Sequence, residues 1–397
     1  MNFKKILYLL LILFSFSCSK DDSTTPAPTA PKTFNDLVIT TIQPTLESNN
    51  LSFNSGGNLS FVDYSFVVGV CYNKTGTPTI SDDVFSLGSS SSQNYFVNIN
   101  NIELGTTYYV RAFAQNNSTG EVKYGNQLSI VIPSSITTSI VKNISITGFS
   151  VDVNVASNLS NNTERGICYS TSQNPTVSNS HSSDSTTGAG NFTVSLDGIN
   201  FSPTYYVSPN TTYYLRSYVE ISGEYYYGNQ VSFKTAGYIG GSGGYVFYDK
   251  GETTNGWRYL EAAPQYLTYN GNSSFRWIST SCTQNTFLNG IGTQIGTGLE
   301  NSQVISNFCN YTSVGATMSM STSLNGQTNW FLPSLDELKE MYKLKVTNLT
   351  NLNSNNYTLL SSSQSSNSLC FILNTSNGSV TTTDKINYNT AWQVRRF

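Results

Sequence analysis

The chain has 397 residues, enough for two to four domains at about 100–200 residues each. Charged residues are only 11% of the sequence, and 20 Lys and Arg stand against 23 Asp and Glu, so no basic footprint for nucleic acid is present. The 26 Tyr and 21 Phe supply packed cores and are atypical of disordered chains. Ser, Thr and Asn replace the missing charge, which indicates a polar, uncharged surface.

The first 18 residues have the pattern of an exported and lipidated protein. Lys4 and Lys5 precede an apolar run at 6–14, which is too short to cross a hydrocarbon core of about 30 Å as a helix. The run ends at Ser17-Cys18, and a small residue directly before Cys resembles the bacterial lipoprotein signal. We therefore expect a signal peptide over 1–17 and lipid on Cys18. The alternative is an ordinary cleaved signal peptide with a chance Cys.

Residues 18–35 are expected to be a flexible linker. Residues 19–22 resemble the short acidic tag that sends some lipoproteins to the outer face of the outer membrane, although they could simply begin the linker. Three Pro follow among Ala, Ser and Thr, a composition typical of an extended spacer. The expected location is therefore the outer membrane, anchored by lipid and exposed at the cell surface, where no nucleotide cofactor is available.

Residues 36–132 and 133–236 form two copies of one domain. Three motifs occur twice: GVCY at 69–72 and GICY at 166–169, YYVR at 108–111 and YYLR at 213–216, and YGNQ at 124–127 and 227–230. A repeat of about 100 residues fits one antiparallel sandwich per copy. The segments ending in Tyr108 and Tyr213 resemble the tyrosine corner of fibronectin type III and immunoglobulin-like domains. The resemblance implies two all-β antiparallel sandwiches.

Cys71 and Cys168 occupy equivalent places in the two copies. Neither has a second Cys in its own domain, so both are interpreted as small buried core residues. His181 is the single His of the chain and is expected in an exposed loop. A site with several His ligands, or a Ser-His triad in the C-terminal region, is thereby excluded.

Residues 237–397 form a third domain, which contains all four Trp: Trp257, Trp277, Trp330 and Trp392. The segments at 243–248, 256–264, 330–338 and 392–397 resemble the Lcl C-terminal domain family of bacterial surface proteins. The resemblance implies a C-type-lectin-like α+β fold with long loops and a role in adhesion. Ser334 and Glu337 have the spacing of a capping box, which predicts a helix from 335 onward. A second helix is expected within 298–311.

Three Cys lie in this domain: Cys282, Cys309 and Cys370. In an oxidising compartment one pair is expected to bond. Cys282 with Cys309 is the first choice and Cys309 with Cys370 the second, and the sequence leaves the assignment open.

The ligand residues expected in the C-terminal domain are Trp277, Arg276, Tyr259 and Asp249. Trp277 lies between Arg276 and a Ser/Thr-rich segment, so we expect it to be exposed and able to stack on a sugar, the alternative being a core position. Neither triplet that binds calcium in lectins occurs, and no metal, cofactor or catalytic residue is predicted. The few Arg favour a neutral glycan or a surface protein over a sulfated glycan.

Three functions remain open from the sequence. The first is a non-enzymatic surface lipoprotein whose sandwiches present a glycan- or protein-binding C-terminal domain. The second is a structural component of an outer-membrane surface complex. The third is a glycan-acting hydrolase, which would need two carboxylates about 5–10 Å apart. Its candidates are Asp249, Glu252, Glu261, Glu300 and Asp336.

Overall fold

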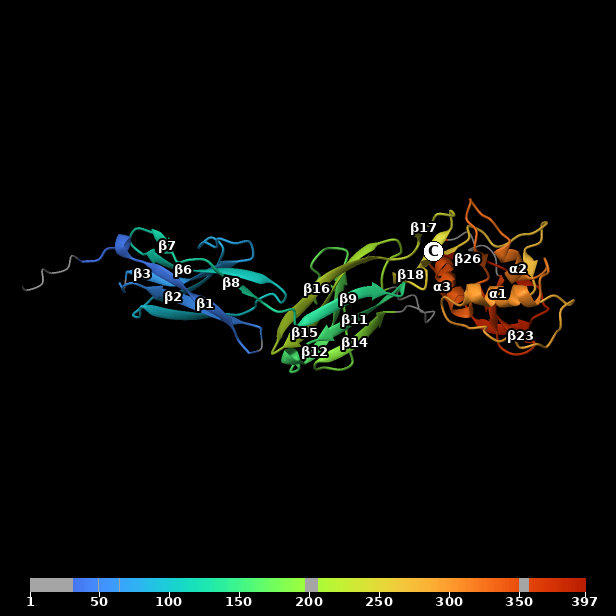
Figure 1. The fold of residues 1–397 in the computed structure, drawn as a ribbon, viewed down its shortest axis with the longest axis horizontal. Coiled ribbons are helices and arrows are strands. Elements are labelled where there is room, and N and C mark those ends of the chain that lie inside the picture. Colours follow the sequence, from blue (N-terminus) through green and yellow to red (C-terminus); the bar gives the residue numbers. More distant parts are fainter. Residues whose placement is uncertain (1–30, 49, 64, 197–205, 350–356) are drawn as a thin grey trace, which may run out of the picture.

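The structure is a computed structural model that describes residues 31–48, 50–63, 65–196, 206–349 and 357–397. These residues form three bodies in a row, with the N-terminal segment at one end and the helix-containing body at the other (Figure 1). No helix within the described ranges is long and apolar enough to span a membrane. The expected signal peptide, Cys18 and most of the linker lie outside the described residues.

The first body is a sandwich of two antiparallel sheets, preceded by a short 3-10 turn, η1 (Phe34–Asp36). One sheet contains β1 (Ile39–Leu46), β2 (Phe53–Leu59) and β5 (Asn94–Ile99). The other contains β4 (Asp83–Ser89), β3 (Phe66–Asn73), β6 (Thr107–Asn116), β7 (Val122–Tyr124) and β8 (Leu128–Val131).

The second body repeats this architecture and includes η2 (Ser157–Leu159). Its sheets are β14 (Gly190–Leu196), β11 (Phe149–Val155) and β9 (Ile136–Lys142), and β13 (Ser180–Ser183), β12 (Glu164–Ser170), β15 (Thr212–Ile221) and β16 (Glu224–Lys234). Three strands facing four is the arrangement of fibronectin III-like and immunoglobulin-like sandwiches. His181 is exposed as expected, but it lies on the edge strand β13, paired opposite Cys168, and not in a loop.

The repeated Tyr of each copy closes a tyrosine corner. The backbone N–H of Glu103 donates to the Tyr108 hydroxyl at 3.0 Å, five residues upstream. The N–H of Ser208 donates to the Tyr213 hydroxyl at the same distance. The two copies therefore turn into β6 and β15 through the same local bond.

The repeated Asn of the YGNQ motif joins the two sheets of each sandwich. Asn126 accepts from the N–H of Thr41 at 3.0 Å, and Asn229 accepts from the N–H of Thr138 at 2.9 Å. Residue 125, just before Asn126, is Gly because a Cβ there would lie 2.6 Å from the Thr41 hydroxyl oxygen. The motif repeats because each sandwich needs it for its framework.

Both equivalent Cys are buried free thiols in the central strands. Burial raises the pKa of the Cys71 thiol to about 11 and that of Cys168 to about 12. A thiol that is neutral and enclosed behaves as a small core residue.

The C-terminal body is α+β, and its described residues, 237–349 and 357–397, form two sheets and three helices. The first sheet has β18 (Tyr245–Thr254), β19 (Trp257–Ala262), β26 (Val394–Arg396) and β21 (Trp330–Phe331), with β17 (Tyr238–Ile239) beside β18. The second has β20 (Ser274–Phe275), β25 (Asn389–Thr390), β22 (Thr358–Gln364), β23 (Leu369–Asn374) and β24 (Val380–Asp384). The helices are α1 (Gly298–Phe308), α2 (Gly315–Met320) and α3 (Leu335–Val346).

The helix α3 begins with the expected capping box, in which Ser334 accepts from the N–H of Glu337 and the Glu337 carboxylate accepts from the N–H of Ser334. Cys282 and Cys309 form a disulfide with 5.9 Å between their Cα atoms, tying a loop to the C-cap of α1. This is the first of the two expected pairings, and it leaves Cys370 as a buried thiol.

The second sandwich and the C-terminal body share a sheet. A two-residue strand of the sandwich, β10 (Ile144–Ser145), pairs antiparallel with β18 of the C-terminal body. The Tyr248 hydroxyl bonds to the side chain of Asn143 at 2.6 Å. Ile146 is fully buried in the core of the C-terminal body. Backbone pairing and a shared core join the two bodies far more firmly than a linker would.

Candidate ligand-binding groove on the C-terminal body

A tight hairpin between β18 and β19 forms one wall of a groove. Asn255 and Gly256 both have positive φ, 52° and 76°, as a two-residue type I′ hairpin requires. The turn brings Lys250 over Trp257, with the ammonium 3.9 Å from the ring centroid. The same ammonium donates to the carbonyl and hydroxyl oxygens of Thr254, both at 2.6 Å. The Lys250 head group is thus held in place at the rim.

The opposite wall is the loop that leads into α1. Gly296 has φ of 94° and packs on the ring of Trp257, where an added Cβ would lie 2.7 Å from a ring carbon. Arg396 on β26 donates to the Gly296 carbonyl at 3.0 Å and pairs with Glu300 at 2.8 Å. The groove between the walls has a volume of about 360 Å³. Six of the nine residues that line it have polar side chains, and the nine are Lys250, Thr254, Asn255, Trp257, Ile295, Gly296, Thr297, Glu300 and Arg396.

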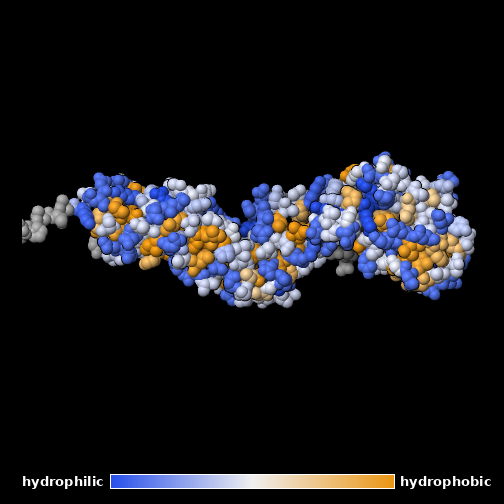
Figure 2. Space-filling view, in the orientation of Figure 1, coloured by the Kyte–Doolittle hydropathy of each residue, from blue (hydrophilic) through white to orange (hydrophobic). Residues whose placement is uncertain are grey.

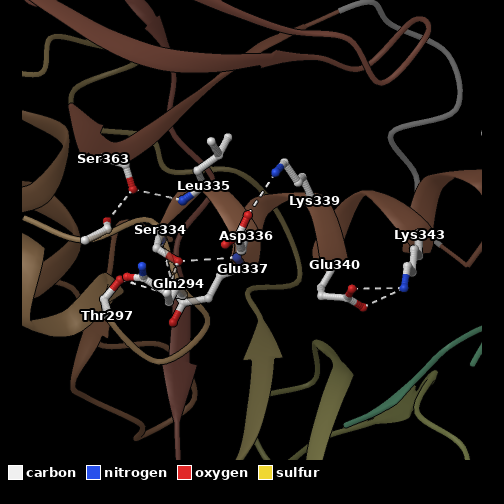
Figure 3. Close-up of polar contacts among 11 residues, drawn as sticks. Gln294, Thr297, Ser334, Leu335, Asp336, Glu337, Lys339, Glu340, Lys343 and Ser363 are labelled. Carbon is white, nitrogen blue, oxygen red and sulfur yellow. Dashed lines mark hydrogen bonds and ion pairs between the residues drawn. The ribbon is translucent and has the colours of Figure 1, made fainter. Parts of the chain in front are cut away.

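Glu337 holds this loop in place by accepting hydrogen bonds from its backbone, and Figure 3 shows Glu337 beside Ser334 at the start of α3. Its carboxylate is fully buried and accepts from the N–H of Gly296 at 2.8 Å, of Gly298 at 3.4 Å and of Ser334 at 2.8 Å. Burial raises the pKa of Glu337 to about 7, although these hydrogen bonds oppose the shift. Glu337 is therefore a positioning residue for the groove and does not line it.

The groove offers hydrogen-bond donors and little net charge. Lys250 and Arg396 supply positive charge and Glu300 supplies negative charge, with Arg396 and Glu300 paired. Desolvation, and next the charge of Arg396, lowers the pKa of Lys250. The hydroxyls and the Asn255 amide can both donate and accept. Such a lining fits a polar ligand that is neutral or weakly acidic.

Two of the expected ligand residues lie beside this groove. Asp249 is buried and accepts from both Nε and Nη2 of Arg258, at 2.7 and 2.9 Å. Tyr259 is half-buried, with its ring 5.3 Å from that of Phe397. Asp249 is thus engaged in a bidentate ion pair, and the groove lies at the tip of the hairpin on which both residues sit.

The expectation that Trp277 is exposed is wrong. Its exposed fraction is 1%, and it belongs to the core around the second sheet, beneath the ammonium of Lys385 at 4.4 Å. The N–H groups of Trp277 and Ile278 both bond to the Lys385 carbonyl at 3.0 Å, which directs this segment inward. Arg276 stacks on Tyr388 at 4.3 Å, away from the hairpin. All four Trp are in fact buried.

The groove residues Lys250, Asn255 and Arg396 were missed by the sequence analysis. The Asn255-Gly256 pair is a strong hairpin signal that could have identified one wall. Nothing local connects Arg396 with the loop before α1, because the two are 100 residues apart and meet only through β26.

Four of the carboxylates considered for a hydrolase are in ion pairs: Asp249 with Arg258, Glu261 with Arg395, Glu300 with Arg396, and Asp336 with Lys339. Within the described ranges, no group of three or more His, Cys, Asp and Glu is placed to hold a metal ion.

No protein-family model and no curated protein matches this sequence. Among solved structures, domains FN1–FN3 of chicken CNTN1 are 16% identical, with 50% of this chain and 67% of that chain covered and a TM-score of 0.19. The chicken interferon gamma receptor alpha chain is 12% identical, with 49% and 98% covered and a TM-score of 0.21. The sandwich fold of the first two bodies rests on their own strand order.

Proposed function

We propose that this protein is a lipid-anchored binding protein of the bacterial outer surface. In this proposal Cys18 carries the lipid, the two sandwiches act as spacers, and the C-terminal body binds a glycan or a surface protein. The resemblance of residues 238–397 to the Lcl C-terminal domain family, and thereby to C-type-lectin-like domains, supports a role in adhesion.

One observation carries the proposal. The three bodies stand in a row, with the chain entering the first body at the far end from the C-terminal body (Figure 1). The pairing of β10 with β18 extends the second sandwich into the C-terminal body. A chain anchored at its N-terminus would thus hold the groove away from the membrane.

The same residues favour binding over catalysis. Asp249 and Glu300 form ion pairs with Arg258 and Arg396, and the carboxyl with a raised pKa, Glu337, is enclosed by backbone N–H groups. A general acid needs to reach its substrate. The groove instead offers fixed donors and acceptors that suit recognition.

The test uses residues 19–397, labelled and applied to glycan and host surface-protein arrays. Wild type is expected to bind, and Lys250→Ala combined with Asn255→Gly should weaken binding about tenfold, a loss of roughly 1.4 kcal/mol. Glycine keeps the positive φ at 255. Lys234→Ala is the matched control, since Lys234 also stacks on an aromatic ring, that of Tyr238, at 4.8 Å. Blank arrays with folded protein would refute ligand binding by the C-terminal body.

A second function, assembly into a surface complex, is favoured by the edge strand β4. Val84, Phe85 and Leu87 on β4 are exposed, whereas the equivalent edge in the second sandwich, β13, is entirely polar. An edge strand has unpaired backbone groups that accept a partner strand. Phe85→Lys should abolish co-purification with another envelope protein, while the equivalent Ser182→Lys should not. Equal recovery of partners with both variants would count against this function.

A further inference from the structure

A second cleft lies where the two sandwiches meet. Its volume is about 710 Å³, within the roughly 300–1,000 Å³ of ligand sites, and both bodies contribute to its lining. The first sandwich supplies the turn between β5 and β6 and the end of β3, and the second supplies β15, the start of β16 and the turn after β12. The outline of the molecule is also hollowed between these two bodies (Figure 2).

Three of the five charged residues of the cleft are linked through the carboxylate of Glu103. Glu103 of the first sandwich forms an ion pair with Lys74 and lies 3.9 Å from Arg216 of the second. Arg216 is itself held by stacking on Tyr227 at 4.7 Å. With Asp83 and Glu224 also in the lining, two cations face three carboxylates. This near balance disfavours a strongly charged ligand such as a phosphate or sulfate ester.

Three amide side chains in the cleft are uncommitted. Asn100, Asn101 and Asn174 are exposed, and none of the three side chains forms a hydrogen bond to another described residue. Each amide presents both a donor and an acceptor, the pair of functions that a sugar hydroxyl matches.

Tyrosine rings complete the lining. Tyr225 is 40% exposed, and Tyr72 and Tyr226 are half-buried. An aromatic face packs against the C–H face of a pyranose ring, and a phenol hydroxyl can bond to its rim. The aliphatic residues of the cleft, Ile102 and Leu104, are both buried, so the Tyr rings supply most of its exposed apolar surface.

The fold does not need these rings. With Tyr227 equivalent to Tyr124, the positions of Tyr225 and Tyr226 are held by Val122 and Lys123 in the first copy, which forms the corresponding strand β7 without them. The aromatic pair is thus specific to the copy whose β16 faces the cleft.

From these observations we propose that the cleft between the sandwiches binds a neutral oligosaccharide, with the Tyr rings stacking on sugar faces and the three Asn bonding to hydroxyls. This site is separate from the groove on the C-terminal body and does not depend on it. The protein would then contact glycan with its spacer as well as with its C-terminal body.

The test is calorimetric titration of residues 19–397 with hexasaccharides of glucose in β-1,4 and α-1,4 linkage, of xylose and of mannose. At least one is expected to bind. Asn101→Gly with Asn174→Gly should weaken binding at least about tenfold, and so should Tyr225→Ala. Glycine suits both Asn positions, where φ is 57° and 56°. Tyr269→Ala, at a residue 39% exposed on the C-terminal body, is the matched control and should change nothing.

Two results would overturn the proposal. One is the absence of heat with all four hexasaccharides at millimolar concentration while thermal unfolding shows folded protein. The other is binding that survives both cleft variants, and loss of that binding in Lys250→Ala with Asn255→Gly would assign it to the C-terminal groove. If the cleft variants lose oligosaccharide binding and the groove variant keeps it, the cleft is the binding site. This conclusion would hold whether or not the arrays detect binding by the C-terminal body.

Discussion

At the residue scale, the strongest constraints are side-chain oxygens that accept from backbone N–H groups. The hydroxyls of Tyr108 and Tyr213 do this at the corners of the sandwiches, and Glu337 does it beneath the groove. A backbone donor that loses its partner on burial costs about 1–3 kcal/mol. Single substitutions that remove one of these acceptor oxygens should therefore measurably lower the free energy of unfolding.

Tyr108→Phe should lower the free energy of unfolding of the first sandwich by about 1–2 kcal/mol, because the N–H of Glu103 loses its acceptor. Tyr213→Phe should cost less, since the bond from Ser208 is exposed and water can replace it. Urea unfolding measures both. Tyr109→Phe, on the same strand with no hydroxyl bond to another described residue, is the control. Equal losses at 108 and 109 would contradict the corner explanation.

Glu337 predicts a pH dependence of the C-terminal body. Its pKa rises from 4.5 to about 7 on folding, so between these values the folded state binds the extra proton. The contribution of this proton to the free energy of unfolding is fully present below pH 4.5. It is lost as the pH rises to about 7, which lowers the free energy of unfolding by up to about 3 kcal/mol. Glu337→Gln should be less stable overall, since an amide would face backbone donors, and should lack this fall.

The measurement is urea unfolding at pH 4.5, 6 and 8. Asp336→Asn is the matched control, because Asp336 is in the same helical turn but forms only a partly exposed pair with Lys339. An identical pH profile in wild type and Glu337→Gln would show that another group is responsible.

At the element scale, the decisive contact is the edge pairing of β10 with β18. Gly251 on β18 has φ of 94°, and a Cβ there would lie 2.2 Å from the carbonyl oxygen of Val141 in the second sandwich. That oxygen belongs to backbone, which cannot move aside as a flexible side chain would. The contact makes Gly251 a sensitive probe of the junction.

Gly251→Ala should separate the second sandwich from the C-terminal body without unfolding either. The expected readout is faster hydrogen exchange at Ile144 and Ser145, together with a less extended molecule in small-angle X-ray scattering. Gly256→Ala controls for backbone strain, since φ is 76° there and nothing lies within 4 Å of the added Cβ. Similar effects from both substitutions would mean that strain alone is acting.

At the scale of the whole molecule, three bodies in a row should respond to force one after another (Figure 1). The Cys282–Cys309 disulfide closes a loop across a sequence separation of 27 residues. This loop cannot be stretched while the disulfide is intact, so the C-terminal body extends by that much less. Cys71 and Cys168, the Cys residues of the two sandwiches, are free thiols. Pulling on single molecules therefore distinguishes the bodies.

Pulling should give increments of roughly 340 and roughly 360 Å for the two sandwiches and one of roughly 470 Å for the C-terminal body, at about 3.5 Å per residue. Reduction should lengthen only the third, by roughly 95 Å. Cys282→Ser should show the longer increment without reductant, and Cys370→Ser should not. If the increment of the C-terminal body had the same length with and without reductant, the pairing of Cys282 with Cys309 would be contradicted.

Much of the framework follows from local patterns. The repeated motifs predicted two sandwiches. The tyrosine-corner bonds join residues that are close in sequence, and the Asn bonds between the sheets recur at the same positions of both copies. The Ser334–Glu337 capping box predicted α3 because its bonds span three residues. The groove could not be predicted in this way, since Arg396 and Gly296 meet through a strand at the end of the chain.

What the sequence by itself determined is therefore the order of two copies of one sandwich and a distinct Trp-containing body, which follow the segment where an export signal and a lipid anchor are expected. Only the tertiary structure decided which side chains face solvent. Trp277 lies beside polar residues yet is buried, because the Lys385 segment, over 100 residues later, covers it. Likewise Ile144 and Ser145 belong to the second sandwich in sequence but complete a sheet of the third body. Burial depends on which distant segment packs against a residue, and the neighbouring residues in the sequence do not predict that segment.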